Sequence, residues 1–270
     1  MLGLYGLVKR DLELKGILPD KFKEPSKIPP VIQDSCFLYV DAINNTGNGH
    51  NNNATSWKNL METPDIPEMQ LGTKYGSPTW KDNACVLPGS SGWYFGKNRI
   101  EGELTMEFCG KFSATNYYNT AATLVSCYDY SITKPYGACL RADWDSNSNL
   151  GFFSSVYYTP DMVNVTTGMK PKVDQKFYFV ASCKRGKYFI RLYRSDVEGY
   201  VEKSGATCEP NFLAGAPWSI GYHPTSSDSP LASERFFFQG DVYSARVHTR
   251  ALTGDEIHQN ALHEMSRYEF

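Results

Sequence analysis

The sequence predicts an all-β protein, built as two packed antiparallel sheets with one short helix at the C-terminus. From residue 36 onward, apolar and polar residues alternate in short segments separated by Gly, Asn, Pro, Ser and Asp, which is typical of strands joined by tight turns. Helical periodicity is nearly absent before residue 253. Aromatic residues make up 14% of the chain, which is enough to fill the core of a broad sandwich.

The strand pattern is clearest in three stretches. Residues 104–108 alternate between apolar and polar side chains. Residues 177–183 and 188–192 each place apolar side chains on one face, and the short Lys-Arg-Gly turn between them predicts a hairpin. A second hairpin is predicted for residues 136–157, around a turn of Asp, Ser and Asn residues.

One helix is predicted, and it begins just after Thr253. Thr253 and Glu256 form a capping box, in which each side chain accepts a hydrogen bond from the other residue's backbone N–H. The apolar residues that follow form one stripe: Ile257, Ala261, Leu262 and Met265. We expect this helix to lie against the sandwich, beside a last strand at residues 242–248.

The first 30 residues predict a separate N-terminal arm, and residues 31–270 predict the sandwich domain. The arm ends in Ile28-Pro29-Pro30, which cannot continue a helix and favours an extended spacer. Its apolar residues are too many for a solvated tail and too few for a core of its own. We therefore expect the arm to dock, either on its own domain or on a neighbouring subunit or larger assembly. The expected anchoring residues are Leu2, Leu4, Leu7 and Val8.

Charge and hydropathy exclude several classes of partner. A formal net charge of -2 and a pI near 6.2 give no general attraction for nucleic acid or anionic membranes. No run approaches the roughly 18 apolar residues of a membrane helix, and the N-terminus lacks a secretory signal pattern. The seven cysteines contain no CxxC pair, so we expect reduced, buried thiols in a chain made without export.

Three segments resemble one known family. The run FQGDVYSARVHTRALTGDEI at residues 238–257 is similar to the closing strand and helix of the concanavalin A-like lectin/glucanase superfamily, in its laminin-G-like branch. Residues 38–60 and 80–95 resemble the first strands of the same modules, and they occur in the same order. The resemblance covers roughly residues 36–268 and is to modules seen in structural and adhesion proteins of bacteriophages and prophages. It implies a jelly-roll sandwich whose concave face or loop rim commonly binds carbohydrate or protein, in a superfold that hosts many functions.

The resemblance also directs attention to Glu103 and Glu107. Glucanases of this superfamily place Glu, Asp and Glu on alternate residues of one strand, and this chain has Glu103, Thr105 and Glu107 at that spacing. Thr105 stands where the assisting carboxylate belongs, and retaining hydrolysis needs two carboxyl groups about 5 to 5.5 Å apart. A solvated strand face produces the same pattern. We therefore expect no enzymatic activity, with a glycoside hydrolase that uses Glu103 and Glu107 as an alternative.

We expect that no cofactor is required. Calcium is the one ion whose binding the sequence leaves possible. The loop that begins at Asp41 and continues through Asn44 and Asn45 is rich in the oxygen ligands that calcium prefers, and several laminin-G-like modules bind calcium. Hydrogen bonds that cap the loop would explain the same composition.

A sugar site needs an exposed aromatic ring for the apolar face of a pyranose, surrounded by amide and carboxylate groups for its hydroxyls. Packing in the core is the alternative for each aromatic residue. The candidates adjoin predicted turns and are Trp93, Asp143, Trp144, Asn147, Tyr157 and Tyr222.

Together these features predict a recognition module on the surface of a bacteriophage virion, made in the cytoplasm of the bacterial host. The arm would bind other virion proteins, while the sandwich would contact cell-surface or mucosal glycans. Display in many copies, or as a homo-oligomer, would let weak sites act together. The alternative is a structural capsid or tail decoration protein that binds no sugar.

Overall fold

The structure is a computed structural model of the 270-residue chain. It describes residues 30–61, 68–73, 77–81, 83–95, 100–114, 121–127, 137–144, 150–158, 162–205, 211–212, 218–223 and 236–270. The proposed anchoring residues of the arm and Asn147 lie outside these ranges.

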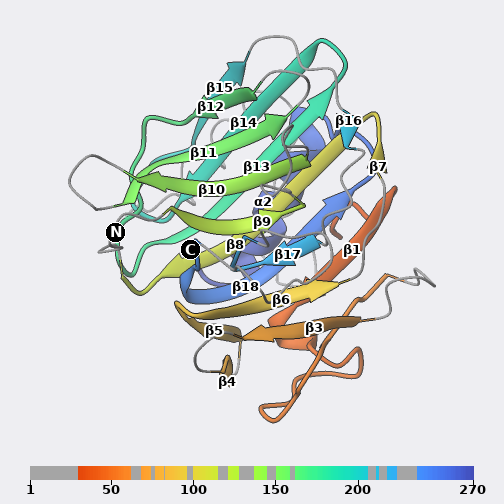
Figure 1. Cartoon of the computed structure of the whole chain (residues 1–270), viewed down its shortest axis with the longest axis vertical. Helices are drawn as coiled ribbons and strands as arrows, with labels where there is room; N and C mark the ends of the chain where they lie inside the picture. Colours follow the sequence, from red (N-terminus) through yellow and green to blue (C-terminus); the bar gives the residue numbers. More distant parts are fainter. Residues whose placement is uncertain are drawn as a thin grey trace, which may run out of the picture.

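Two eight-stranded antiparallel sheets pack face to face, so the predicted all-β jelly-roll sandwich is confirmed (Figure 1). The first sheet has the spatial order β15 (Tyr200–Gly205), β14 (Lys187–Arg194), β13 (Lys176–Lys184), β8 (Leu104–Phe112), β18 (Gln239–His248), β5 (Ala84–Pro88) and β4 (Thr79–Lys81), and β1 (Cys36–Asp41) also pairs with β18. The second sheet has the order β12 (Met162–Thr166), β11 (Leu150–Tyr158), β10 (Gly137–Trp144), β9 (Ala122–Ser126), β17 (Trp218–Ile220), β6 (Ser91–Phe95), β3 (Glu68–Thr73) and β2 (Trp57–Lys58). A separate pair is formed by β7 (Ile100–Glu101) and β16 (Asn211–Phe212).

Strand β18 is central to the first sheet. One of its edges pairs with β8 along almost its whole length. Its other edge pairs first with β5, from Gln239 to Val242, and then with β1, from Ser244 to His248. The first and last strands of the described chain are therefore neighbours.

Both predicted hairpins are confirmed, and their apolar faces form the core between the sheets. Strands β13 and β14 pair from Phe177–Arg194 to Lys184–Lys187, and Gly186 takes the positive φ of 74° that the tight turn requires. Strands β10 and β11 pair around the second turn. The core contains a group of aromatic rings contributed by both sheets: Phe108, Phe112, Phe153, Phe177 and Phe238.

The predicted C-terminal helix, α2 (Gly254–Arg267), forms a third layer on the outer face of the first sheet, behind both sheets in Figure 1. Its capping box is present, with both the Thr253 and the Glu256 side chains accepting as expected. Ile257 and Ala261 pack on a second apolar cluster with Tyr178, Val180 and Tyr193 of the sheet. Strand β13 therefore has a buried face on each side, because its alternate residues contact either the second sheet or α2.

Six of the seven cysteines lie within the described ranges, and all six are free and buried, as predicted. Burial raises the pKa of Cys36 and of Cys85 to about 12, so these thiols stay protonated at neutral pH. Within the described part of the chain, no helix is both long and apolar enough to cross a membrane.

Candidate functional site

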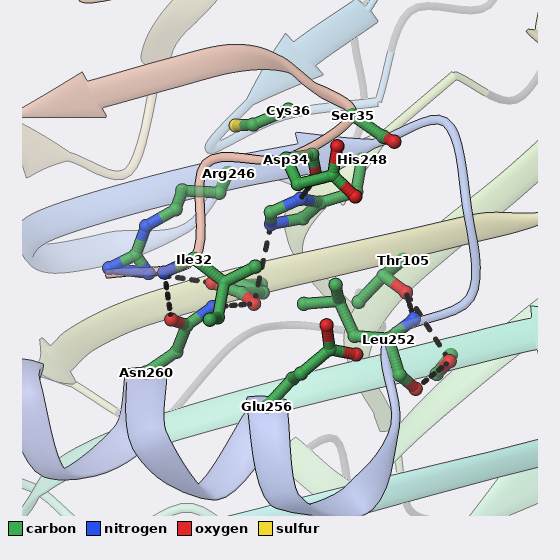
Figure 2. A network of polar contacts seen from close by, with 12 residues as sticks. Ile32, Asp34, Ser35, Cys36, Thr105, Arg246, His248, Leu252, Glu256 and Asn260 are labelled. Carbon is green, nitrogen blue, oxygen red and sulfur yellow. Dashed lines mark hydrogen bonds and ion pairs between the residues drawn. The ribbon is translucent and has the colours of Figure 1, made fainter. Parts of the chain in front are cut away.

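Glu107, one of the two carboxylates singled out as a catalytic pair, lies in a buried polar cluster with Arg246, His248 and Asn260, which are labelled in Figure 2. Its carboxylate accepts hydrogen bonds from Arg246 Nη1 at 2.6 Å and Asn260 Nδ2 at 2.8 Å, and His248 Nε2 lies 3.5 Å away. Arg246 also pairs with Glu264 of α2. Glu107 and Arg246 are each only 1% exposed. The sequence led us to expect either a solvated face or an open groove here, and at Glu107 both expectations are wrong because α2 covers this part of the strand.

This environment fixes Glu107 as a carboxylate. Burial alone would raise its pKa, but the charge of Arg246 and hydrogen bonds from His248 and Asn260 outweigh burial and lower the pKa to about 2. A general acid needs a proton near neutral pH, and a nucleophile needs access to the substrate. Glu103 is exposed and accepts a hydrogen bond from Ala251 N at 3.1 Å. The alternative hydrolase site at Glu103 and Glu107 is therefore not supported by this geometry.

The oxygen-rich loop after β1 uses its side chains to hold itself together. Asp41 Oδ1 accepts from Ile43 N at 2.8 Å and from Tyr268 Oη at 3.0 Å, while its Oδ2 pairs with Arg267 at 2.5 Å. Asn44 accepts from Gly49 N, and Asn45 bonds the backbone of Asn51 through both ends of its amide. Among the residues that the structure describes, no group of three or more His, Cys, Asp or Glu side chains is arranged to hold a metal ion.

Two of the proposed sugar-binding aromatic residues are core residues. Trp93 is 1% exposed and packs against Trp57 and Trp80, with ring centroids 5.9 and 5.6 Å away. Tyr222 is fully buried. Neither ring is available to a sugar from solvent, which corrects the sequence-based assignment. Both were chosen because they adjoin turns, and proximity to a turn does not report the direction of a side chain.

Asp143 joins three neighbouring strands on the outer face of the second sheet. Arg141, two residues earlier on β10, pairs with Asp143 Oδ1 through Nη2 at 2.9 Å. Ser154 of β11 donates to Asp143 Oδ2 at 2.9 Å, and Asn164 of β12 donates to the same oxygen at 3.5 Å. Arg141 and Asp143 are each about one quarter exposed, with side-chain values of 23% and 27%. The cluster thus combines a fixed ion pair with partial access to solvent.

An exposed aromatic ring lies on the same face. Phe152 of β11 is 42% exposed, and Val173 is the other large apolar residue with such exposure among the described residues. Residues 152 and 154 point to the same side of β11, so the ring of Phe152 lies on the face that carries Ser154 and Asp143. Lys170 Nζ lies 6.0 Å from the centroid of the Phe152 ring. An aromatic ring beside a hydrogen-bonded charged pair is the arrangement that a sugar site requires.

The sequence analysis identified Asp143 in this group and missed Arg141, Phe152, Ser154 and Asn164. A signal for Phe152 was present: two consecutive phenylalanines in a strand must face opposite sides, so one of them lies outside the core or under another layer. Trp144 and Tyr157 belong to β10 and β11, and the structure describes their backbones without their side chains.

No protein-family model and no curated protein sequence matches the chain. Solved structures with a similar fold do exist. Domain 4 of AbnA, a GH43 extracellular arabinanase from Geobacillus stearothermophilus, in complex with arabinotriose, has a TM-score of 0.58 and 16% identity and covers 84% of this chain and 98% of that one. A sialidase of Trypanosoma rangeli in complex with sialic acid has a TM-score of 0.56 and 12% identity, and covers 98% of this chain and 38% of its own.

A weaker similarity is to the enzymatically active domain of tailspike protein 2 of bacteriophage CBA120, with a TM-score of 0.47 and 10% identity over 70% of this chain and 29% of that one. A similarity at that TM-score is too weak to support a conclusion about this chain. The chain spans less than two fifths of the sialidase, so the activity of that whole enzyme does not transfer to it.

These findings define the class of the protein: an all-β sandwich whose structural neighbours are domains of carbohydrate-active proteins. They also correct one expectation. The prediction that the chain is not an enzyme is contradicted, because the neighbours come from an arabinanase and from sialidases. At 11–16% identity the likeness shows the fold, and it assigns no reaction to this chain.

Proposed function

We propose that the protein binds glycans on the outer face of the second sheet, around Phe152 and the Arg141–Asp143 pair, in a sandwich of the concanavalin A-like, laminin-G-like type. The observation that carries the proposal is the exposed ring of Phe152 beside the cluster in which Asp143 is hydrogen-bonded from three strands. The fold shared with domains of an arabinanase and a sialidase supports the choice of ligand class.

The chemistry of each group suits a sugar. The ring offers an apolar plate to the C–H face of a pyranose, and the guanidinium of Arg141 is a hydrogen-bond donor for hydroxyl oxygens. An ionised carboxylate has about four acceptor positions, so Asp143 can accept from a sugar hydroxyl while it keeps its bonds to Arg141 and Ser154. The pair is held in place before a ligand arrives, which lowers the entropic cost of binding. Trp144 and Tyr157 belong to the same two strands, and the proposed site does not depend on them.

The proposal extends to the setting of the protein. Residues 1–30 would anchor it to other virion proteins, and the sandwich would be displayed on a bacteriophage surface after synthesis in the host cytoplasm, where buried thiols stay reduced. Its partners would be cell-surface or mucosal glycans. One shallow site binds weakly, so display in many copies or as a homo-oligomer would supply the avidity. Calcium at Asp41, Asn44 and Asn45 is not part of the proposed site.

A glycan array with the full-length chain, presented multivalently, tests the proposal. The wild type is expected to bind a subset of glycans, and Phe152→Ala is expected to lose at least tenfold in affinity because the apolar plate is gone. Val173→Ala is the matched control, since it removes a side chain of equal 42% exposure elsewhere and should leave binding unchanged. Released sugar measured in the same samples reports any hydrolysis. Equal binding by Phe152→Ala and the wild type, or no binding by a folded, multivalent sample, would overturn the proposal.

A further inference from the structure

Phe236 has an unusual backbone conformation. Its φ is 59°, in the left-handed region that Gly and Asn adopt and bulky side chains rarely do. Hydrogen bonds hold the chain in place around it: Phe236 O accepts from Thr123 N at 2.7 Å, and Phe238 N donates to Gly221 O at 2.7 Å. Backbone strain of this kind persists where the surrounding structure enforces it, and it is frequent at ligand sites.

The ring of Phe236 lies on the outer face of the second sheet. It contacts the ring of His223, with the two ring centroids 5.9 Å apart, and His223 Nδ1 lies 3.2 Å from Ser126 Oγ. Val125 and Cys127, on either side of Ser126 in the chain, belong to the core between the sheets, so Ser126 points to the outer face. Ser126 and His223 are buried, whereas Phe236 is partly exposed. Phe236 is therefore the member of this group that solvent reaches.

Phe236 and Phe152 lie near the two ends of one row of residues across the second sheet. Thr123 pairs with Arg141, and Arg141 pairs with Ser154, across the neighbouring strands β9, β10 and β11 (Figure 1). Phe236 adjoins the other edge of Thr123, because Thr123 N donates to it. Phe152 is two residues from Ser154 and on the same face of β11. Three strand spacings separate the two phenylalanines, which amounts to roughly 14 Å.

The Arg141–Asp143 pair lies between the two rings. Its strand, β10, is next to the strand of Phe152 on one side and to β9 on the other, and Phe236 lies beyond β9. A single pyranose is too short to contact two rings that are roughly 14 Å apart. Several linked sugars can contact both rings and the charged pair. Two contacts joined in one ligand reinforce each other, because the second forms at a high effective concentration once the first has formed.

We propose that the glycan is an oligosaccharide that crosses β11, β10 and β9, with one sugar on Phe152, hydroxyl groups at the Arg141–Asp143 pair and a further sugar on Phe236. This inference rests on the proposed function and adds to it a second aromatic contact and a minimum length of the ligand. The positive φ of Phe236 serves the site by holding the ring on the outer face, against His223. His223 is a positioning residue, since it is buried behind that ring.

A length series of oligosaccharides tests the inference on the full chain. Galactan, glucan, mannan and arabinan oligosaccharides, each from the disaccharide to the hexasaccharide, are titrated by calorimetry. In the series that binds, the affinity of the wild type should rise at least tenfold from the disaccharide to the hexasaccharide, because only the longer ligand reaches both rings. Equal affinity at every length would overturn the inference.

Substitution of Phe236 locates that gain. Phe236→Asn removes the ring, and because Asn adopts positive φ more readily than most residues the variant should fold, which its melting temperature verifies. It should keep the affinity for the disaccharide and lose at least fivefold for the hexasaccharide. Phe236→Tyr keeps an aromatic ring and should bind both ligands as the wild type does. A gain with length that Phe236→Asn retains in full would overturn the inference.

Phe152→Ala separates this inference from the proposed function. It should weaken the binding of the disaccharide and of the hexasaccharide alike. If Phe152→Ala weakens binding and the length of the ligand has no effect, the contact at Phe236 is wrong and the proposed function stands. If Phe152→Ala binds every ligand like the wild type, or if no glycan binds the folded chain, the proposed function fails and this inference fails with it.

Amide chemical shifts give a measurement on the unaltered protein. The hexasaccharide should shift the signals of Phe236 and Thr123 as well as those of Phe152 and Ser154, whereas the disaccharide should shift only the second pair. Glu202 of β15 belongs to the other sheet and is the control that should not move. Shifts that stay confined to Phe152 and Ser154 when the hexasaccharide is bound would overturn the inference.

Discussion

Phe152 and Phe153 are adjacent on β11 and point to opposite sides of the second sheet. Phe153 is fully buried, with its ring centroid 4.8 Å from that of Phe177, while Phe152 is 42% exposed beside Asp143 and Lys170. One ring therefore belongs to the core and its neighbour to the proposed glycan face. Substituting each of these two phenylalanines in turn therefore separates an effect on stability from an effect on ligand binding.

Truncating the two rings should have different consequences. Phe153→Ala removes a packed core side chain and should lower the free energy of unfolding by about 3 to 5 kcal/mol. Phe152→Ala removes a half-exposed ring and should lower it by less than about 1 kcal/mol, as surface changes usually do. Chemical denaturation of both variants measures this. Similar losses in the two variants would show that Phe152 supports the fold and would weaken its assignment to the ligand face.

Replacing Glu107 should destabilise the protein strongly. Glu107→Gln removes one partner of a buried ion pair and leaves Arg246 opposite a neutral amide, which typically costs about 3 to 5 kcal/mol. Glu103→Gln is the matched control on the same face of the strand, and because Glu103 is exposed we expect a change below about 0.5 kcal/mol. Chemical denaturation midpoints of the two variants and the wild type measure these losses of stability. Equal midpoints would mean that the buried cluster contributes nothing to stability.

The same carboxylate predicts the response of the fold to acid. The pKa of Glu107 is lowered in the folded protein to about 2, from an ordinary value near 4.5, since the charge of Arg246 and its hydrogen bonds outweigh the opposing effect of burial. A group whose folded pKa is lowered contributes stability that is fully present above its unfolded pKa and is lost as the pH falls toward the folded pKa. Stability should therefore fall between about pH 4.5 and pH 2.

Melting temperatures measured across that range for the wild type and Glu107→Gln test the attribution. The difference in melting temperature between the two proteins should shrink as the pH falls. Protonation of Glu107 abolishes in the wild type the ion pair with Arg246 that the substitution has already removed. A difference that is constant from pH 6 to pH 2.5 would show that Glu107 does not account for the acid sensitivity.

Calcium is expected to have no effect on stability. Both carboxylate oxygens of Asp41 are engaged, by Tyr39, Tyr268 and Arg267 among others, and the amides of Asn44 and Asn45 hold their own loop. Addition of millimolar calcium or of a chelator should shift the melting temperature by less than about 1 °C, since only an ion that binds the folded state adds stability. Asp41→Asn should lower it regardless of calcium. A clear rise with calcium that Asp41→Asn abolishes would establish a metal site at this loop.

Local patterns in the sequence were enough to predict several of the strands, both hairpins and the helix cap. Alternation determines which residues share a face of a strand, and the Thr253–Glu256 capping box determines where α2 begins, because both effects act within a few residues. The sequence analysis also named Asp143 as a candidate before its hydrogen-bond partners were known.

Local sequence patterns did not predict which element covers each face of a strand. Residues 103, 105 and 107 do share a face, but whether that face meets solvent, a ligand or α2 depends on a helix about 150 residues away in the chain. Trp93 was taken for a surface ring for the same reason, since its neighbours Trp57 and Trp80 are brought to it by other strands. The partners of Asp143 likewise come from β11 and β12, through strand register that a single sequence does not specify.

Chemical-shift mapping with the glycan that binds best tests the central claim most directly. Titration of the labelled full-length chain should perturb amide signals on β10, β11 and β12, with the largest changes near Phe152, Ser154 and Asn164, and should leave α2 and residues 30–35 unchanged. Perturbations centred on α2, on residues 30–35 or on the loop after Asp41 would contradict the account and would move the ligand site to another face of the sandwich.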